Sequence, residues 1–227
     1  MKIKLNNIIN TSIISDIVDF IYPRRCPICF NEITSNEVIC KSCLKSIQEE
    51  IKPTLDKIDK TYNHLYLGRY HTSPLLSHLI HLLKYERIKE IGIFLGDLIS
   101  KYFYSYIQKN NLKKFEYIIP VPTSKKRLIY RGFNHIEIIA EKVSSELNIR
   151  YIKNGIIKIK ETKTQASLNY NQRLINLKNA FKSNIDFFFK DKKIILIDDV
   201  LTTGTTIKEI IKVLKVEKIF ILTILKT

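Results

Sequence analysis

The residues of this chain that point most directly to chemistry lie between Ile194 and Thr206. The apolar run Ile194-Ile195-Leu196-Ile197 is followed by two adjacent carboxylates, Asp198 and Asp199. A loop rich in hydroxyl groups comes next and consists of Thr202, Thr203, Gly204, Thr205 and Thr206. The apolar run is typical of a buried strand, and the spacing of apolar residues after the loop predicts a helix.

Each part of this segment suits a ligand that carries both a phosphate and vicinal hydroxyls. Carboxylates accept hydrogen bonds from hydroxyls, directly or through Mg²⁺. The loop offers hydroxyls and backbone N–H groups to a phosphate, and the N-terminus of the following helix adds the positive end of its dipole. The alternative is a strand end with an ordinary threonine cap, but four threonines around one glycine exceed what a cap requires. A Walker P-loop is excluded because no Lys follows the glycine in the required place.

Two further segments contain candidate anion-binding residues. A predicted strand at residues 117–121 is followed by a basic loop with Lys125, Lys126, Arg127 and Arg131. A polar stretch at residues 163–176 contains Gln165 and Arg173. For both segments the alternative is an ordinary surface whose charges are simply solvated, as a loop in the first case and a helix in the second.

All four cysteines lie close together near the N-terminus, as Cys26-Pro27-Ile28-Cys29 and Cys40-Lys41-Ser42-Cys43. Two CxxC turns brought together complete a tetrahedral set of thiolates suited to zinc. Two disulfides are the competing interpretation, which is disfavoured because nothing marks the chain as exported. A closed four-cysteine site leaves no open coordination position, so the zinc is expected to be structural. The metal would hold together a module too small to have its own core.

Strand and helix patterns alternate along the rest of the chain, which predicts an α/β fold with a mostly parallel sheet. Predicted strands are residues 65–70, 117–121, 155–159, 194–197 and 219–225. Predicted helices are residues 74–84, 88–108, 134–147, 168–177 and 206–214. We expect two domains: residues 1–60, with an N-terminal helix and the cysteine module, and residues 61–227, the α/β domain. Ligands of such a sheet bind at the carboxyl ends of its strands.

The net charge of +16 is concentrated in the second region. Residues 1–60 carry nine Lys and Arg against eight Asp and Glu, whereas residues 61–227 carry 29 against 14. Such an excess fits a polyanionic ligand, either a phosphorylated sugar or a nucleic acid, or else a solvated lysine-rich surface. No apolar stretch approaches the ~18 residues of a membrane span, and residues 8–20 suit an amphipathic helix better than a signal peptide. We therefore expect a cytoplasmic protein.

The segment from Asp198 to Thr206 closely resembles the signature with which type I phosphoribosyltransferases bind phosphoribosyl pyrophosphate (PRPP). The chain as a whole is similar to the ComF/GntX family of competence-associated, phosphoribosyltransferase-like proteins. The resemblance extends from about residue 23 onward. It is carried by both CxxC pairs, Pro120-Val121-Pro122, Arg127, Arg131-Gly132-Phe133-Asn134, Thr164-Gln165, Arg173, Asn176, Ala180-Phe181 and the Asp198–Thr206 segment. One departure is Thr205, where members of the family usually have a smaller residue.

This resemblance implies the identity of the ligand and the roles of several residues. It implies that PRPP binds with Mg²⁺ at Asp198, Asp199 and the loop of Thr202, Thr203, Gly204, Thr205 and Thr206. The basic loop with Arg127 and Arg131 would hold the pyrophosphate. The stretch with Gln165 and Arg173 would be the hood loop that closes over bound PRPP.

The resemblance also implies a role in natural transformation, in which the protein handles incoming single-stranded DNA. A competence helicase or DNA-processing proteins would be its partners. The alternative is a Mg²⁺-dependent phosphoribosyltransferase that acts on a small-molecule acceptor unrelated to DNA. In that case a nucleophile displaces pyrophosphate at C1 of PRPP through an oxocarbenium-like transition state, and the sequence identifies neither the acceptor nor a catalytic base.

Overall fold

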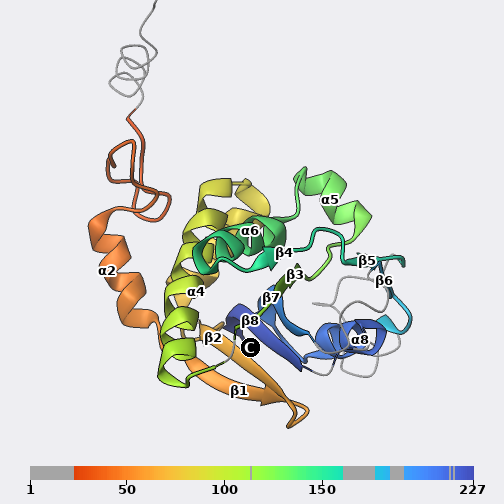
Figure 1. Ribbon diagram of the computed structural model, residues 1–227. Coiled ribbons are helices and arrows are strands. Elements are labelled where there is room, and N and C mark those ends of the chain that lie inside the picture. Colours follow the sequence, from red (N-terminus) through yellow and green to blue (C-terminus); the bar gives the residue numbers. More distant parts are fainter. Residues whose placement is uncertain (1–22, 113, 161–176, 185–191, 215, 217) are drawn as a thin grey trace, which may run out of the picture. The chain divides into compact units, whose positions relative to one another are not determined.

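The computed structural model describes residues 23–112, 114–160, 177–184, 192–214, 216 and 218–227 (Figure 1). The chain divides into two compact units, Met1–Ser46 and Ile47–Thr227. The division therefore falls earlier than residue 60. Residues 54–58, which we had assigned to the cysteine module, form a strand that pairs within the sheet of the larger unit.

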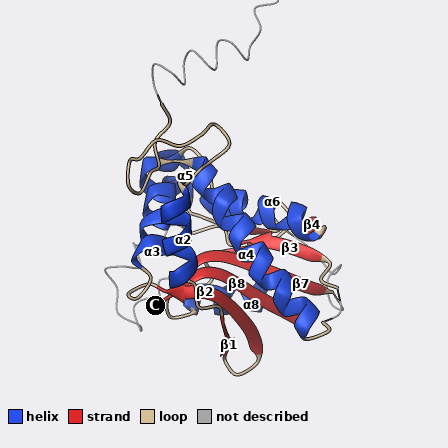
Figure 2. Ribbon diagram, turned by 90° about the vertical axis from the view of Figure 1, so that its left-hand side faces the viewer, coloured by secondary structure: helices blue, strands red, loops and turns tan. Residues whose placement is uncertain are grey.

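The larger unit is built on a six-stranded sheet with the strand order β1-β2-β8-β7-β3-β4 (Figure 2). The strands are β1 (Thr54–Ile58), β2 (Tyr62–Arg69), β3 (Tyr117–Pro120), β4 (Arg150–Tyr151), β7 (Lys193–Leu201) and β8 (Lys218–Lys226). Only the edge strand β1 runs antiparallel to its neighbour. The mostly parallel sheet is thus confirmed.

Helices cover both faces of this sheet. They are α3 (Pro74–His81), the π-helical turn η1 (Leu82–Glu86), α4 (Lys89–Lys109), α5 (Lys125–Arg131), α6 (His135–Leu147) and α8 (Thr205–Leu214). On one face, Ile194 and Leu196 of β7 share an apolar cluster with Ile207 of α8. On the other, Phe220 of β8 packs against Phe103 of α4, with ring centroids 5.0 Å apart. Burial on both faces explains why β7 and β8 are continuous apolar runs rather than alternating ones.

The predicted strand at residues 155–159 has a different partner from the one expected. It forms β5 (Ile156–Lys158), which pairs antiparallel with β6 (Phe181–Ser183) in a separate two-stranded sheet. The strand that pairs parallel with β3 is instead β4, which is only two residues long. A pattern of alternating apolar residues identifies a strand but does not identify its partner, and a two-residue strand has no detectable pattern.

The basic segment after β3 is a short helix, α5, rather than the predicted loop. The Ser124 hydroxyl caps its start by accepting a hydrogen bond from the amide of Arg127 at 3.3 Å. Gly132 ends it with a φ of +78°, a conformation that favours glycine. The predicted N-terminal helix and nearly all of the predicted helix 168–177 lie outside the described residues. Within the residues that the structure describes, no helix is both long and apolar enough to cross a membrane.

A buried histidine, His64 on β2, lies inside the sheet of the larger unit. The Thr223 hydroxyl donates to the carbonyl of Leu225 at 2.9 Å, so it accepts the hydrogen bond that joins it to Nε2 of His64 at 2.8 Å. The Nδ1 atom of His64 has no hydrogen-bond partner within the described part of the chain. Burial, and next the charge of Lys226, lower the pKa of His64 to about 3.

We predict that His64 makes the larger unit sensitive to acid. In the unfolded chain this histidine takes up a proton below pH 6.5, whereas the folded protein excludes that proton down to about pH 3. The stability that it contributes is therefore present above pH 6.5 and is lost as the pH falls, by about 1.4 kcal/mol per pH unit. Urea denaturation at about pH 7.5 and about pH 5 should show that His64→Gln loses about 2 kcal/mol less than the original protein does. His71→Gln, a change at an exposed histidine, serves as the control. An equal loss in His64→Gln and the original protein would contradict the prediction.

Candidate functional site

A cleft of about 200 Å³ opens at the carboxyl ends of β3 and β7 in the larger unit. Its polar and charged lining residues are Lys84, Thr123, Ser124, Arg127, Arg131, His135, Lys158, Asp198, Asp199, Thr202 and Thr206. The rest of the lining is mainly apolar and includes Val121, Phe181 and Ile207, with Gly204 in the loop before α8. Ligands of parallel α/β sheets bind at this edge.

The two adjacent carboxylates lie within β7 itself, which is longer than predicted and runs to Leu201. Asp198 is opposite Thr223 of β8, and the pairing continues in register to the end of the strand. Successive side chains of a strand point to opposite faces. Asp199 therefore shares a face with Ile195 and Ile197, and Asp198 shares the other with Leu196.

Asp199 is buried, and its two oxygens contact three other residues. Its Oδ1 accepts a hydrogen bond from the amide of Val200 at 2.7 Å. Its Oδ2 accepts one from Nε2 of His135 at 2.9 Å and forms an ion pair with the ammonium of Lys84. Nδ1 of His135 is 3.0 Å from a guanidinium nitrogen of Arg131, which can only donate. His135 is therefore a neutral imidazole that carries its proton on Nε2.

The charges in this network explain its pKa shifts. Burial acts to raise the pKa of Asp199, but the ammonium of Lys84 and the hydrogen bond from His135 outweigh it and hold this pKa well below its usual range. Burial, and next the charge of Asp199, raise the pKa of Asp198 well above its usual range. Burial is also the main cause of the lowered pKa of His135. The two neighbouring carboxyl groups thus differ in character.

The hydroxyl-rich loop connects β7 to α8. Gly204 has a φ of +73°, and α8 begins at the next residue. Thr202, Gly204 and Thr206 line the cleft. The hydroxyls of Thr203 and Thr205 instead form a hydrogen bond with each other, with 2.8 Å between the two oxygens, and Thr205 is buried. These two predicted residues support the loop, while the other three border the cleft beside a helix N-terminus, where a phosphate is favoured.

Four cationic side chains from three parts of the chain reach the cleft: Lys84 of η1, Arg127 and Arg131 of α5, and Lys158 of β5. Arg131 is buried under the ring of Tyr85, 5.6 Å from its centroid. Its Nε is a buried donor without a hydrogen-bond partner among the described residues. An anion in the cleft fits this excess of donors. Of the other predicted residues, Gln165 and Arg173 lie outside the part of the chain that the structure describes.

Lys84 and Lys158 line the cleft although the sequence does not predict them, and His135 is not among the predicted site residues. Lys84 ends a predicted helix, and nothing in its local sequence indicates that the helix continues as a π-helical turn. Such turns occur often at functional sites, but sequence patterns do not reveal them. His135 directly follows Asn134, which caps α6 with a 3.2 Å hydrogen bond from the amide of Ile136. Its position at a helix start beside a strand end was the available signal.

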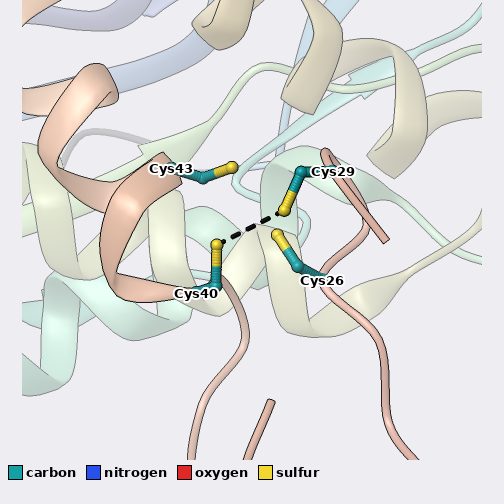
Figure 3. A group of neighbouring side chains, drawn as sticks. All are labelled: Cys26, Cys29, Cys40 and Cys43. Atoms are coloured by element: carbon teal, nitrogen blue, oxygen red, sulfur yellow. Dashed lines mark hydrogen bonds between the residues drawn. The ribbon is translucent and has the colours of Figure 1, made fainter. Parts of the chain in front are cut away.

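In the smaller unit, the four cysteines form one cluster (Figure 3). The Sγ atoms of Cys26, Cys29, Cys40 and Cys43 all lie within 4.8 Å of one another. A tetrahedral zinc site with Zn–S bonds of about 2.3 Å requires sulfurs about 3.8 Å apart, so the arrangement fits this metal. Hydrogen bonds from Ser42 and from the amide of Cys43 lower the pKa of Cys40 to about 6, whereas burial raises the pKa of Cys43, so of these two thiols Cys40 is the one favoured as the thiolate that zinc requires.

Comparisons with known proteins match both parts of the chain. The double zinc ribbon domain family matches residues 17–55, and the phosphoribosyl transferase domain family matches residues 137–222. Competence protein F of Haemophilus influenzae is 32% identical over 191 residues, which cover 84% of this chain and 78% of that protein. The DNA utilization protein YhgH of Escherichia coli K12 is 27% identical over 203 residues, 83% of each chain. Competence protein ComFC of Streptococcus pneumoniae is 33% identical over 58% of this chain and 55% of its own length.

A solved structure, adenine phosphoribosyl transferase from Trypanosoma brucei, overlaps with a TM-score of 0.39. The two chains are 14% identical, and the overlap covers 86% of this chain and 70% of that chain. The matched domain families and the mostly parallel sheet nevertheless confirm the predicted fold class. It is a mixed α/β phosphoribosyltransferase-like fold preceded by a four-cysteine module consistent with a zinc ribbon.

We predict that the purified protein contains one zinc ion per chain, bound by the four cysteines. Metal analysis should find zinc in the original protein and its loss in Cys43→Ser, because three thiolates do not complete a closed site. A chelator should make the thiols reactive toward a thiol reagent and unfold the module. Ser46→Ala, which removes a hydroxyl that donates to the carbonyl of Ser42, is the control. A folded, zinc-free protein with four reactive thiols would rule out the site.

Proposed function

Because this chain belongs to the competence protein F (ComF) family, which joins a double zinc ribbon to a phosphoribosyltransferase domain, we propose that it binds PRPP with Mg²⁺ and handles single-stranded DNA. PRPP would bind in the cleft at the end of β7. The names of its relatives, competence protein and DNA utilization protein, support the link to DNA. The zinc ribbon would be structural.

The observation that carries the PRPP proposal is the combination of groups around the cleft. Carboxylates at the end of β7 can accept hydrogen bonds from the ribose hydroxyls. The part of the loop before α8 that lines the cleft, Thr202, Gly204 and Thr206, suits the 5-phosphate. Arg127 and Arg131 of α5 lie on the β3 side of the cleft and suit the pyrophosphate. A ligand with two separate phosphate groups and vicinal hydroxyls is complementary to all three parts.

The donor set around Asp198 also suits Mg²⁺. This ion prefers carboxylate and hydroxyl oxygens and keeps part of its water shell. Burial and the negative charge of Asp199 raise the pKa of Asp198, and the ammonium of Lys84, which pairs with Asp199, offsets them only in part. A divalent ion would supply that missing positive charge and would neutralise charge on the pyrophosphate. Asp198 is therefore the chain's main candidate for holding it.

The surface beside the cleft has features that support nucleic-acid binding. Tyr130 at the end of α5 is 61% exposed, and the guanidinium of Arg87 lies 5.5 Å from its ring centroid. The guanidinium also donates a 2.5 Å hydrogen bond to the carbonyl of Tyr130, which holds the two residues together. An exposed aromatic ring beside Arg forms a stacking platform for a single-stranded base. Phe133, which follows α5 closely in the chain, is less exposed and packs against Lys89.

We predict that Asp198→Asn/Asp199→Asn binds PRPP at least roughly tenfold more weakly than the original protein, because hydrogen bonds to charged groups are lost. Calorimetric titration with Mg²⁺–PRPP measures the affinity, and thermal melting checks that the domain folds. Asp97→Asn on α4, which removes a half-buried carboxylate outside the cleft lining, is the matched control. Undiminished affinity in the folded double variant would exclude the assigned site.

We also predict that single-stranded DNA binds mainly through its phosphates, so the logarithm of affinity should fall linearly with the logarithm of salt concentration. Tyr130→Ala should reduce affinity by roughly 1–3 kcal/mol through lost stacking. Tyr104→Ala on α4, at a similarly exposed tyrosine, should not. Filter binding across a salt series measures both effects.

The same assay separates two arrangements of the ligands. If DNA and PRPP both use Arg127 and Arg131, saturating Mg²⁺–PRPP should weaken DNA binding. Unchanged DNA affinity would mean separate sites. A DNA affinity that does not change with salt concentration would contradict the DNA function. A phosphoribosyltransferase for a small-molecule acceptor would then be the better account.

A further inference from the structure

The two adjacent aspartates of the cleft face different layers of the fold. Asp199 is on the side of β7 where Lys84 of η1 and His135 of α6 reach it. Asp198 shares its face with Ile194 and Leu196, which pack in the cluster that contains α8. The strand alternation thus directs two chemically identical side chains into two different environments.

Asp199 has little capacity left for a ligand. A carboxylate accepts about four hydrogen bonds. Val200, His135 and Lys84 occupy three of these positions, and the residue is only 6% exposed. Its environment is that of a buried charge already compensated by the protein, which points to a role in holding its partners in place.

Asp198 is in the opposite situation. Its Oδ1 accepts a hydrogen bond from the amide of Asp199 at 2.9 Å, and no ion pair engages it among the residues that the structure describes. It lines the cleft and is more exposed than Asp199. A carboxylate of this kind gains more from a hydroxyl donor or a cation supplied by a ligand.

Lys84 is the partner of Asp199 that retains free capacity. Its ammonium has three N–H donors, its side chain is 21% exposed, and it lines the cleft. It belongs to one connected chain of contacts: Lys84 to Asp199, Asp199 to His135, and His135 to Arg131. Lys84 and Arg131 are therefore two cations that one buried carboxylate and one neutral imidazole hold on the same side of β7.

We propose that Asp198 alone receives the ribose hydroxyls or their metal ion, that Lys84 is an additional binding residue for the pyrophosphate, and that Asp199 is a positioning residue for Lys84. This assignment rests on the proposed PRPP function and divides a pair of residues that the sequence treats alike. Lys84 and Arg131 contact the pyrophosphate from the η1 and α5 side. The loop before α8 contacts the 5-phosphate.

Two fragments of PRPP test the assignment: inorganic pyrophosphate and ribose 5-phosphate, each titrated with Mg²⁺ by calorimetry. Lys84→Met should weaken pyrophosphate binding roughly tenfold or more, because a charged hydrogen bond is lost, and should leave ribose 5-phosphate binding nearly unchanged. Lys84→Arg should restore most of the pyrophosphate affinity. Asp198→Asn should have the opposite effect: it should weaken ribose 5-phosphate binding and leave pyrophosphate binding nearly unchanged.

Asp199→Asn gives the sharpest result because the direction of the change in pyrophosphate affinity distinguishes the two explanations. Removal of a negative charge near a pyrophosphate should strengthen binding if only long-range electrostatics acts. Positioning predicts weaker pyrophosphate binding instead, with no further loss when Lys84→Met is added, since both changes act through one contact. If Asp199→Asn does not fold, the Lys84→Met and Lys84→Arg variants still decide whether Lys84 binds the pyrophosphate. Lys101→Met, at a 72% exposed lysine of α4, controls for the loss of one positive charge.

The outcomes separate this inference from the function on which it rests. If the original protein binds PRPP and Lys84→Met binds pyrophosphate equally well, the role of Lys84 is overturned and the PRPP site stands. Tighter pyrophosphate binding in Asp199→Asn would overturn the positioning role. An original protein that binds neither PRPP nor pyrophosphate would overturn the proposed function and this inference together.

Discussion

A buried carboxylate is stable only if the protein compensates its charge, and in the larger unit Asp199 imposes that requirement. It lies near the carboxyl end of the apolar strand β7, where it is only 6% exposed and water cannot solvate it fully. Lys84 and His135 therefore have to meet it there, and His135 in turn binds Arg131. One charge thus ties η1, α6 and the end of α5 to β7, and these are the elements that surround the cleft.

The same constraint accounts for the electrostatic character of the cleft. Because Lys84 forms an ion pair with Asp199 and His135 donates a hydrogen bond to it, the negative charge of Asp199 is compensated within the protein and does not repel an anionic ligand. Arg127, Arg131 and Lys158 add positive charge on the surrounding elements. Asp198 remains as a carboxylate with few partners of its own. The cleft is thereby suited to a ligand that is mostly anionic but also carries hydroxyls, which is the chemistry of a phosphorylated ribose.

Much of the site was predictable because it is local in sequence. The strand, the carboxylates and the hydroxyl loop are contiguous from Ile194 to Thr206, so their arrangement follows from a strand that turns directly into a helix. The cysteine cluster was predictable for the same reason, since two CxxC turns have few ways to present four thiolates. Lys84 was not predictable, because it is more than a hundred residues from Asp199 along the chain and depends on a π-helical turn.

By itself, the sequence determined the fold class, the four-cysteine cluster and the position of the hydroxyl-rich loop between β7 and α8, since each depends on periodicity or on short spacing. Only the tertiary structure decided which side chains share a face. It separated Asp198 from Asp199, directed Thr205 inward and Thr206 toward the cleft, and paired β5 with β6 instead of β3. The physical reason is that burial and charge compensation involve residues far apart in the chain. A local sequence pattern does not predict which distant residue will pair with a buried charge, or which strand will pair with a short strand.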